Sequence, residues 1–216
     1  MNAKANTQAL PDGAAIAEDG SIVLRLSESA AIPSRQGWKA EPQTINELVF
    51  HRLRGAAWRE AQAAKEVTEA VVSKMLRLPV AVTKRIVLAE RDNQAVAVIV
   101  AQLWGDCRNI PERATRLPNG GRALPLLYPV AGGETIYGEL QFRPLPVATI
   151  KQLPKPQHDK FMATAIQLSC GLPPRIAWLL ADRMDAVDCS SIQAVVGELC
   201  AGAVGIRAQS IMRERP

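Results

Sequence analysis

Few residues of this 216-residue chain have the types and spacing that catalysis or metal binding would require. The two histidines, His51 and His158, fall in a predicted strand and at a predicted helix start, and no nucleophile motif accompanies either of them. The four cysteines form no C-x-x-C pair, and no group of His, Cys and Asp has the spacing of metal ligands. We therefore predict no enzyme, no catalytic residue, no metal site and no cofactor.

Two further patterns resemble binding motifs but lack the context that such motifs need. Asp182, Asp185 and Asp188 are three residues apart, whereas a calcium loop needs closely alternating oxygen ligands followed by a glutamate. We interpret these aspartates as groups that cap and solvate helix ends. The glycine pairs at 120–121 and 132–133 lack the strand and helix context of a phosphate-binding loop, so they are predicted to be turns.

Three sequence patterns indicate that the chain contains the same plan twice. The motif E-L-x-F-x-x-L occurs at residues 47–53 and again at 139–145, 92 positions later (139 − 47). The dipeptide Leu-Pro recurs at residues 78 and 172, an offset of 94. A third set of apolar residues recurs at an offset of 96, where Val96, Ile99, Val100 and Leu103 match Ile192, Val195, Val196 and Leu199. Because the three anchors keep their order and slip only slightly, we interpret them as an internal duplication.

Periodicity then predicts what each copy contains. Residues that alternate between apolar and polar predict paired strands, and apolar steps of three or four predict the short helices that follow. The predicted fold class is α+β, with two tandem copies of a unit made of a two-stranded antiparallel β-ribbon followed by about four short helices. The predicted segments are a disordered N-terminus (1–20), the first unit (21–106), a linker (107–122), the second unit (123–204) and a basic C-terminal tail (205–216).

Charge and composition restrict the class of partner. The net charge of +5 is spread over both halves of the chain, without the dense basic patch of a nucleic-acid interface. The helices predicted at 93–104 and 189–203 are the candidates for reading a DNA groove, yet neither contains Lys or Arg. No apolar run reaches the roughly 18 residues of a membrane helix, and no signal pattern opens the chain. We expect a cytoplasmic protein with reduced cysteines and no membrane contact.

Apolar residues in a small unit can pack in its core or contact a partner. Trp58, Trp104, Trp178 and Tyr128 fall in helix or edge segments, where they either anchor a partner or fill a seam between the two units. The candidate partner-binding residues, chosen by repetition and expected exposure, are Leu48, Phe50, Trp58, Leu140, Phe142 and Trp178. The alternative is that they form the core, which burial statistics for Leu and Phe favour.

The order of short motifs in the second unit matches a known family. A strand carries E-L-Q-F-R-P-L at 139–145, a helix runs into G-L-P-P at 171–174, and M-D-A-V-D at 184–188 opens the last helix. This pattern resembles the phage tail assembly chaperones of Mu-like and P2-like long-tailed phages. The first unit has the same skeleton, with R-L-P-V at 77–80 in place of G-L-P-P. Usual family members hold one such unit, so a duplication is a departure from the family.

The resemblance implies a non-enzymatic role in viral tail morphogenesis. Such chaperones bind the helical, aggregation-prone tape-measure protein in the host bacterial cytoplasm and help tail tube protein to assemble around it. The resemblance therefore implies the tape-measure protein as partner, with tail tube protein as a second candidate, and two linked units would raise avidity. Homo-oligomerisation stays open. The alternative function is a small basic DNA-binding regulator or accessory protein of a phage or prophage, although the even charge disfavours nucleic acid as a partner.

Overall fold

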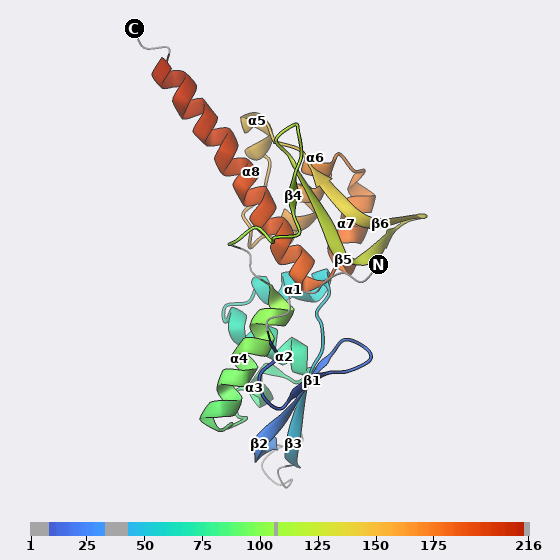
Figure 1. Cartoon of the computed structure of the whole chain (residues 1–216), viewed down its shortest axis with the longest axis vertical. Helices are drawn as coiled ribbons and strands as arrows, with labels where there is room; N and C mark the ends of the chain where they lie inside the picture. The colour runs from blue at the N-terminus through green and yellow to red at the C-terminus, as the bar shows by residue number, and fades with distance from the viewer. Residues whose placement is uncertain (1–8, 33–42, 106–107, 214–216) are drawn as a thin grey trace. The chain divides into compact units, whose positions relative to one another are not determined.

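The computed structural model describes residues 9–32, 43–105 and 108–213, with the side chains of 204–213 left out of the description. The described residues form a mixed α+β fold with two three-stranded antiparallel sheets and eight helices (Figure 1). The chain divides into two compact units. Unit 1 is Met1–Leu53 with Glu60–Trp104, and unit 2 is Arg54–Arg59 with Gly105–Pro216.

Unit 1 places its sheet before its helices. The sheet has the order β1-β2-β3, with β2 in the middle, and is followed by four helices, of which α1 begins in the segment that belongs to unit 2. The strands are β1 (Ala14–Ile16), β2 (Ile22–Ile32) and β3 (Gln43–Phe50). The helices are α1 (Gly55–Gln62), α2 (Val67–Leu76), α3 (Val80–Thr83) and α4 (Glu90–Trp104).

Unit 2 repeats this order of elements. Its sheet has the order β4-β5-β6, again with the longest strand in the middle. The strands are β4 (Thr115–Arg116), β5 (Arg122–Gly132) and β6 (Thr135–Phe142). The helices are α5 (Val147–Ile150), α6 (Phe161–Cys170), α7 (Pro174–Arg183) and α8 (Ala186–Arg213). Within the described part of the chain, no helix combines the length and the apolar character needed to cross a bilayer.

Each sheet buries one face against its helices because apolar residues alternate along the strands. In unit 1, Leu24 of β2 lies opposite Leu48 of β3, and both side chains are buried. In unit 2, Leu124 lies opposite Leu140 in the same way. Helices complete the two cores with buried apolar side chains, which are Val71, Met75, Ile99 and Leu103 in unit 1 and Ile166, Leu180, Ile192 and Val195 in unit 2.

The turn before the middle strand is built alike in the two units, 100 residues apart (120 − 20). The N–H of Gly20 donates to the carbonyl of Ala17 over 2.9 Å, and the N–H of Gly120 donates to that of Leu117 over 3.0 Å. Both glycines have positive φ, 78° and 79°. Glycine reaches this left-handed region without steric cost, which explains the residue type at both turns.

The Leu-Pro anchors also take equivalent places. Helix α2 ends at Arg77 with φ 54°, and helix α6 ends at Gly171 with φ 68°, so both helices close with a left-handed residue. Pro79 and Pro173 then precede α3 and α7 with nearly equal backbone angles, φ −59° and −57°. The two helices differ in length, however, since α3 has four residues and α7 has ten.

Three predictions about the segments require correction. The sheets are three-stranded rather than two-stranded, because β1 and β4 pair with the middle strands. As a result, described residues of the predicted disordered segment 1–20 and of the predicted linker 107–122 belong to sheets. The predicted tail 205–216 is helical up to Arg213, in keeping with the lack of proline from residue 186 to residue 215. Residues 1–8, 33–42, 106–107 and 214–216 lie outside the described residues.

Candidate functional site

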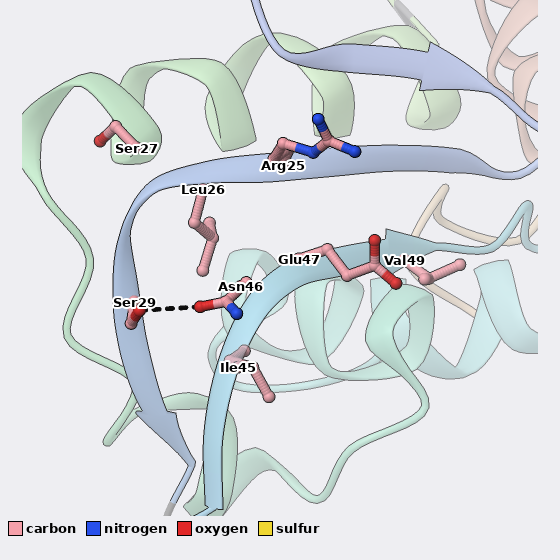
Figure 2. Close-up of a pocket in the computed structure, with 8 residues that line it drawn as sticks. All are labelled: Arg25, Leu26, Ser27, Ser29, Ile45, Asn46, Glu47 and Val49. Atoms are coloured by element: carbon pink, nitrogen blue, oxygen red, sulfur yellow. Dashed lines mark hydrogen bonds between the residues drawn. The ribbon is translucent and has the colours of Figure 1, made fainter.

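The middle strand of unit 1 contains a large bulge, which forms the candidate site. Arg25 pairs with Glu47 and Ala30 pairs with Ile45, so the four residues 26–29 of β2 face a single residue of β3. An unequal count of this kind bends the longer strand and interrupts the ladder. Figure 2 shows β2 curving away at this point.

A buried carboxylate holds the bulge. Asp92 lies in the first turn of α4 and is 3% exposed. Its Oδ1 and Oδ2 each accept the N–H of Ser27 over 3.1 Å, and Oδ2 also accepts the Ser27 hydroxyl over 2.9 Å. Hydrogen bonds to a charged acceptor are among the stronger ones, and the positive end of the helix dipole favours an anion at this position. The hydrogen-bond partners of Asp92 thus lie on strand β2.

An open concavity of about 790 Å³ lies where the strands separate. The Ser29 hydroxyl donates to Asn46 Oδ1 over 2.7 Å across the gap, and Figure 2 shows this bond between β2 and β3. The lining mixes charged, polar and apolar side chains and consists of Arg25, Leu26, Ser27, Ser29, Ile45, Asn46, Glu47 and Val49. This mixture suits a polypeptide surface better than a purely apolar ligand, because both charged and half-buried apolar groups are presented.

The same bulge occurs in unit 2 with a different set of partners. The four residues 126–129 face Gly138, and Asp188 Oδ1 and Oδ2 each accept the N–H of Leu127 over 3.1 Å. Asp188 is fully buried, and Arg113 Nη2 donates to its Oδ1 over 2.7 Å and to the Ser191 hydroxyl over 3.0 Å. Burial lowers the pKa of Arg113, and the charge of Asp188 opposes this shift. The guanidinium therefore stays charged and neutralises the buried carboxylate.

The far end of the unit 2 hairpin rests on helix α7. A Cβ on Gly132 would lie 2.8 Å from the Tyr137 ring and 3.0 Å from the side chain of Ile176, which shows how closely the hairpin approaches α7. Arg183 Nη1 at the other end of α7 donates to the carbonyl of Ala131 over 3.1 Å. Figure 1 shows α7 beside β5 and β6, whereas the distal half of the β2–β3 hairpin extends beyond the short helix α3.

Residues Arg54–Arg59 belong to the core of unit 2. The N–H of Gly55 donates to the carbonyl of Met184 over 2.8 Å, and a Cβ on Gly55 would lie 1.8 Å from the carbonyl oxygen of Ala181. Trp58 is 1% exposed, and its Nε1 donates to the Ser190 hydroxyl over 3.2 Å. The glycine at position 55 is therefore required by close approach of two backbones.

The structure places the predicted partner-binding residues in the cores rather than on a contact surface. The side chains of Leu48, Phe50, Trp58, Leu140 and Phe142 are all less than 5% exposed. Trp178 is half-buried, with the Arg59 guanidinium 5.3 Å from its ring centre and Asp182 paired with that guanidinium at 2.5 Å. A partner cannot reach the five buried side chains in this fold, so repetition of Leu and Phe marked the core.

The other chemically reactive residues are not brought together. His51 and His158 lie in different units, and His158 pairs with Asp159 on the surface at 2.6 Å. Asp185 does cap α8, since its Oδ1 accepts the N–H of Val187 over 2.9 Å, whereas Asp182 and Asp188 have the ion-pair roles described above. The three described cysteines are free thiols, and burial raises the pKa of Cys170 to about 12. Among the described residues, no group of three His, Cys, Asp or Glu side chains could hold a metal ion.

Large apolar side chains are exposed at other positions. Among the described residues, Val87 is 83% exposed and Ile136 is 73% exposed. The remaining members of this set are Ile16, Val80, Val98 and Tyr128. Val80 ends the R-L-P-V motif and Tyr128 is one of the aromatic residues that the sequence singled out, whereas only exposure identifies the other four. Comparison of the chain with protein-family models, curated proteins and solved structures finds no match.

Proposed function

We propose that this chain is a non-enzymatic phage tail assembly chaperone that binds the tape-measure protein and aids assembly of the tail tube in the host cytoplasm. We also infer that its two units are tandem copies of one module. The proposal includes tail tube protein as a second partner. It assigns no cofactor and no catalytic residue.

The observation that carries the proposal is that the motifs of the resemblance have the same structural places in both units. The E-L-x-F motif ends the outer strand, β3 or β6, in each sheet. The Leu-Pro dipeptide follows a left-handed helix end in each unit. Asp92 and Asp188 both hold a four-residue bulge from the last helix. Short motifs that have the same structural role in both units support descent from one module. They also support the family resemblance, because that resemblance rests on these motifs.

Surface features support a polypeptide as the partner. Each sheet leaves its outer strand paired on one side within the described residues, and large apolar side chains such as Val87 and Ile136 are exposed. Open strand edges and exposed apolar side chains are features that other proteins bind. Two such units on one chain would engage a long client at two points, which raises the effective concentration at the second point.

A binding titration tests the proposal. The purified full chain is titrated against overlapping fragments of the tape-measure protein encoded nearest to its own gene, with fluorescence anisotropy as the readout. We expect saturable binding to at least one fragment, and a scrambled fragment of equal composition is the matched control. Equal binding to the scrambled control, or none to any fragment, would contradict the proposal.

The DNA-binding alternative makes an opposite prediction in a second titration. A regulator that contacts several phosphates would lose affinity for duplex DNA by orders of magnitude between about 50 and 200 mM salt. We expect no DNA binding at the higher concentration and little at the lower. Tight, steeply salt-dependent DNA binding without fragment binding would favour the regulator.

A further inference from the structure

We propose that the outer edge of β3 is a docking edge for an extended segment of another polypeptide, which adds to the unit 1 sheet as a fourth strand and places a Lys or Arg opposite Glu47. The inference does not rest on the proposed function, because it names a mode of recognition rather than a client. It concerns a part of β3 that none of the predicted contact residues identified, namely the backbone of Ile45, Glu47 and Val49.

Two independent observations show which backbone groups of β3 face outward. The N–H of Arg25 donates to the carbonyl of Gly13 on the β1 side. The backbone N–H and C=O groups of the even-numbered neighbours of Arg25 in β2 therefore point toward β3. They lie opposite even-numbered residues, as in the pair Leu24 and Leu48. At the end of β3, the N–H of His51 donates away from the sheet, to the carbonyl of Met75. Because direction alternates along a strand, both observations turn the odd-numbered groups of β3 outward.

The outward groups have no backbone partner among the described residues. β3 pairs with β2 alone, and no hydrogen bond joins the N–H or C=O groups of Ile45, Glu47 and Val49 to another described segment. The opposite edge of the sheet is different, since β1 covers β2 there. The eight residues of β3 contain no proline and no lysine, which are common protections of an open edge. A row of alternating donors and acceptors at this spacing matches an extended strand.

The side chains on this edge define the chemistry of the occupant. Glu47 is exposed, and Ile45 and Val49 on either side of it are half-buried. On its inner side, β3 already accepts the pattern apolar–x–basic, since Val23 lies opposite Val49 and Arg25 lies opposite Glu47. A strand on the outer side with the same pattern would make the same favourable cross-strand pairs. The bulge of β2 leaves the concavity open beside these residues, so long side chains of the occupant have room.

A second copy of the chain fits this edge less well. An antiparallel pair of β3 strands related by a two-fold axis at Glu47 would place the two Glu47 carboxylates directly opposite each other. Like charges in that position are destabilising. A register shifted by two residues avoids this contact but leaves each Glu47 opposite Ile45 or Val49. The charge of Glu47 therefore selects a basic partner strand over self-pairing.

The test uses the full chain and a defined probe, the capped peptide Thr-Val-Thr-Lys-Thr-Val-Thr, in an NMR titration of backbone amides. We expect saturable shifts that centre on Ile45 to Val49. Replacing the peptide lysine by glutamate, or Glu47→Gln in the protein, is expected to weaken binding by roughly threefold to fivefold, in the range of a cross-strand charge pair. Methylating the alternate amide nitrogens of the peptide is expected to abolish binding, because the backbone bonds are lost.

Comparison of Glu47→Pro with Glu47→Gln separates the contribution of the backbone N–H from that of the charge. Glu47→Pro removes an outward N–H but no ladder bond to β2, so the sheet is expected to fold. We expect it to weaken binding at least about tenfold, more than Glu47→Gln, in line with a lost backbone hydrogen bond. Glu139→Pro at the matching position of β6 is the control and should leave the shifts at β3 unchanged. If Glu47→Pro unfolds, the methylated peptide still decides the question.

Three results would overturn the inference. The first is the absence of saturable shifts along Ile45 to Val49 at millimolar peptide. The second is equal binding by the methylated peptide, which would mean that the backbone edge is not used. The third is a dimer of the chain that Glu47→Pro dissociates, which would make a second copy the occupant. None of these results depends on whether the chain binds a tape-measure protein, so failure here is distinct from failure of the proposed function.

Discussion

Each unit holds its strand bulge with a buried carboxylate from its last helix, which is Asp92 in unit 1 and Asp188 in unit 2. The other hydrogen-bond partners of these two carboxylates differ. In unit 1 the Ser27 hydroxyl adds a bond to Asp92, at 2.9 Å. In unit 2 the corresponding strand residue is Leu127, which has no hydroxyl, and Arg113 supplies a bond at 2.7 Å instead. At the position of Arg113, 100 residues earlier, unit 1 has Gly13. We call the bonds from this carboxylate to the strand N–H the clamp of each unit. The clamp is the same in both units, while the group that donates a further hydrogen bond to the carboxylate differs.

A second difference concerns the surface at the start of the last helix. In unit 2 the residues Met184, Ala186, Cys189 and Ser190 are fully buried, in the region where Gly55 and Trp58 pack. The positions 96 residues earlier in unit 1 are Leu88, Glu90, Asn93 and Gln94, which are half-buried or exposed. Apolar and small residues thus occur where residues 54–59 cover the helix, whereas three of the four matching positions in unit 1 are polar. Burial of a polar group without a partner is costly, which explains this difference.

The largest expected effect comes from removing the clamp of unit 2. Asp188→Ala leaves the Arg113 charge half-buried and unpaired and the N–H of Leu127 without its acceptor. Breaking a buried charge pair costs about 3–5 kcal/mol of the free energy of unfolding. Chemical denaturation measures this loss, and Arg113→Met with Asp188→Asn is the matched double variant, expected to lose less. Equal losses would contradict the role of the charge pair.

The next effect tests the close packing of residues 54–59 in unit 2. Gly55→Ala would place a Cβ 1.8 Å from the carbonyl oxygen of Ala181, so the backbone must shift. Overpacking of this kind costs about 1–3 kcal/mol, and we expect the upper end because backbone atoms meet. The control is Gly197→Ala, where no atom lies within 4 Å in helix α8 and the change should stabilise by about 0.5–1 kcal/mol. Thermal unfolding measures the change in stability of each variant, and the two changes should have opposite signs.

The clamp of unit 1 should matter less than that of unit 2. Asp92→Ala removes the acceptor of two Ser27 groups, but it leaves no buried charge behind. Hydrogen bonds to charged groups contribute about 1.5–3 kcal/mol each, and the exposed Ser27 can recover some of this by binding water, so we expect a loss of about 2 kcal/mol. Denaturation with the Asp188→Ala variant alongside gives the comparison. A larger loss for Asp92→Ala would reverse the account of the two clamps.

The smallest effect concerns the ion pair between Arg122 and Glu198 in unit 2. Arg122 Nε and Nη2 bind Glu198 over 2.8 and 2.7 Å, and this bond lowers the pKa of Glu198 below its usual 4.5. A lowered pKa gives stability that is present above the unfolded value and lost as the pH falls through the folded value. Because the pair is solvent-exposed, Glu198→Gln should cost under about 1 kcal/mol at pH 7. The difference from the parent chain should shrink as the pH falls below 4.5 and vanish once the pH lies below the lowered pKa of Glu198, and a difference that does not change with pH would exclude this cause.

The sequence predicted the parts of the fold that depend on local periodicity. The strand in E-L-x-F and the helices around Leu-Pro were predicted because alternation and helical steps are visible within a few residues. Strands β1 and β4 have three and two residues, which are too few to show a period. They are strands because they pair with β2 and β5. The bulge depends on bonds between residues 65 and 61 positions apart, from Ser27 to Asp92 and from Leu127 to Asp188. Asp92 and Asp188 are also 96 positions apart, but Asp188 was interpreted as a helix cap.

The candidate site was harder to predict than the fold. Repeated Leu and Phe residues suggested a contact surface, and the structure buries them because a unit of this size needs them for its core. The edge of β3 carries its information in backbone direction, which no residue type reveals. Only the order of the strands and the bonds of Arg25 and His51 identify that edge.

Co-expression tests the central claim most directly. The tape-measure protein from the same genome is expressed alone, with this chain, and with the Asp188→Ala variant, and its soluble fraction is measured after centrifugation and gel filtration. The account predicts that the tape-measure protein is insoluble alone, soluble with the parent chain, and eluted with it as one complex, with less complex formed by the destabilised variant. A tape-measure protein that stays insoluble with the parent chain, or that is soluble but elutes apart from it, would contradict the account.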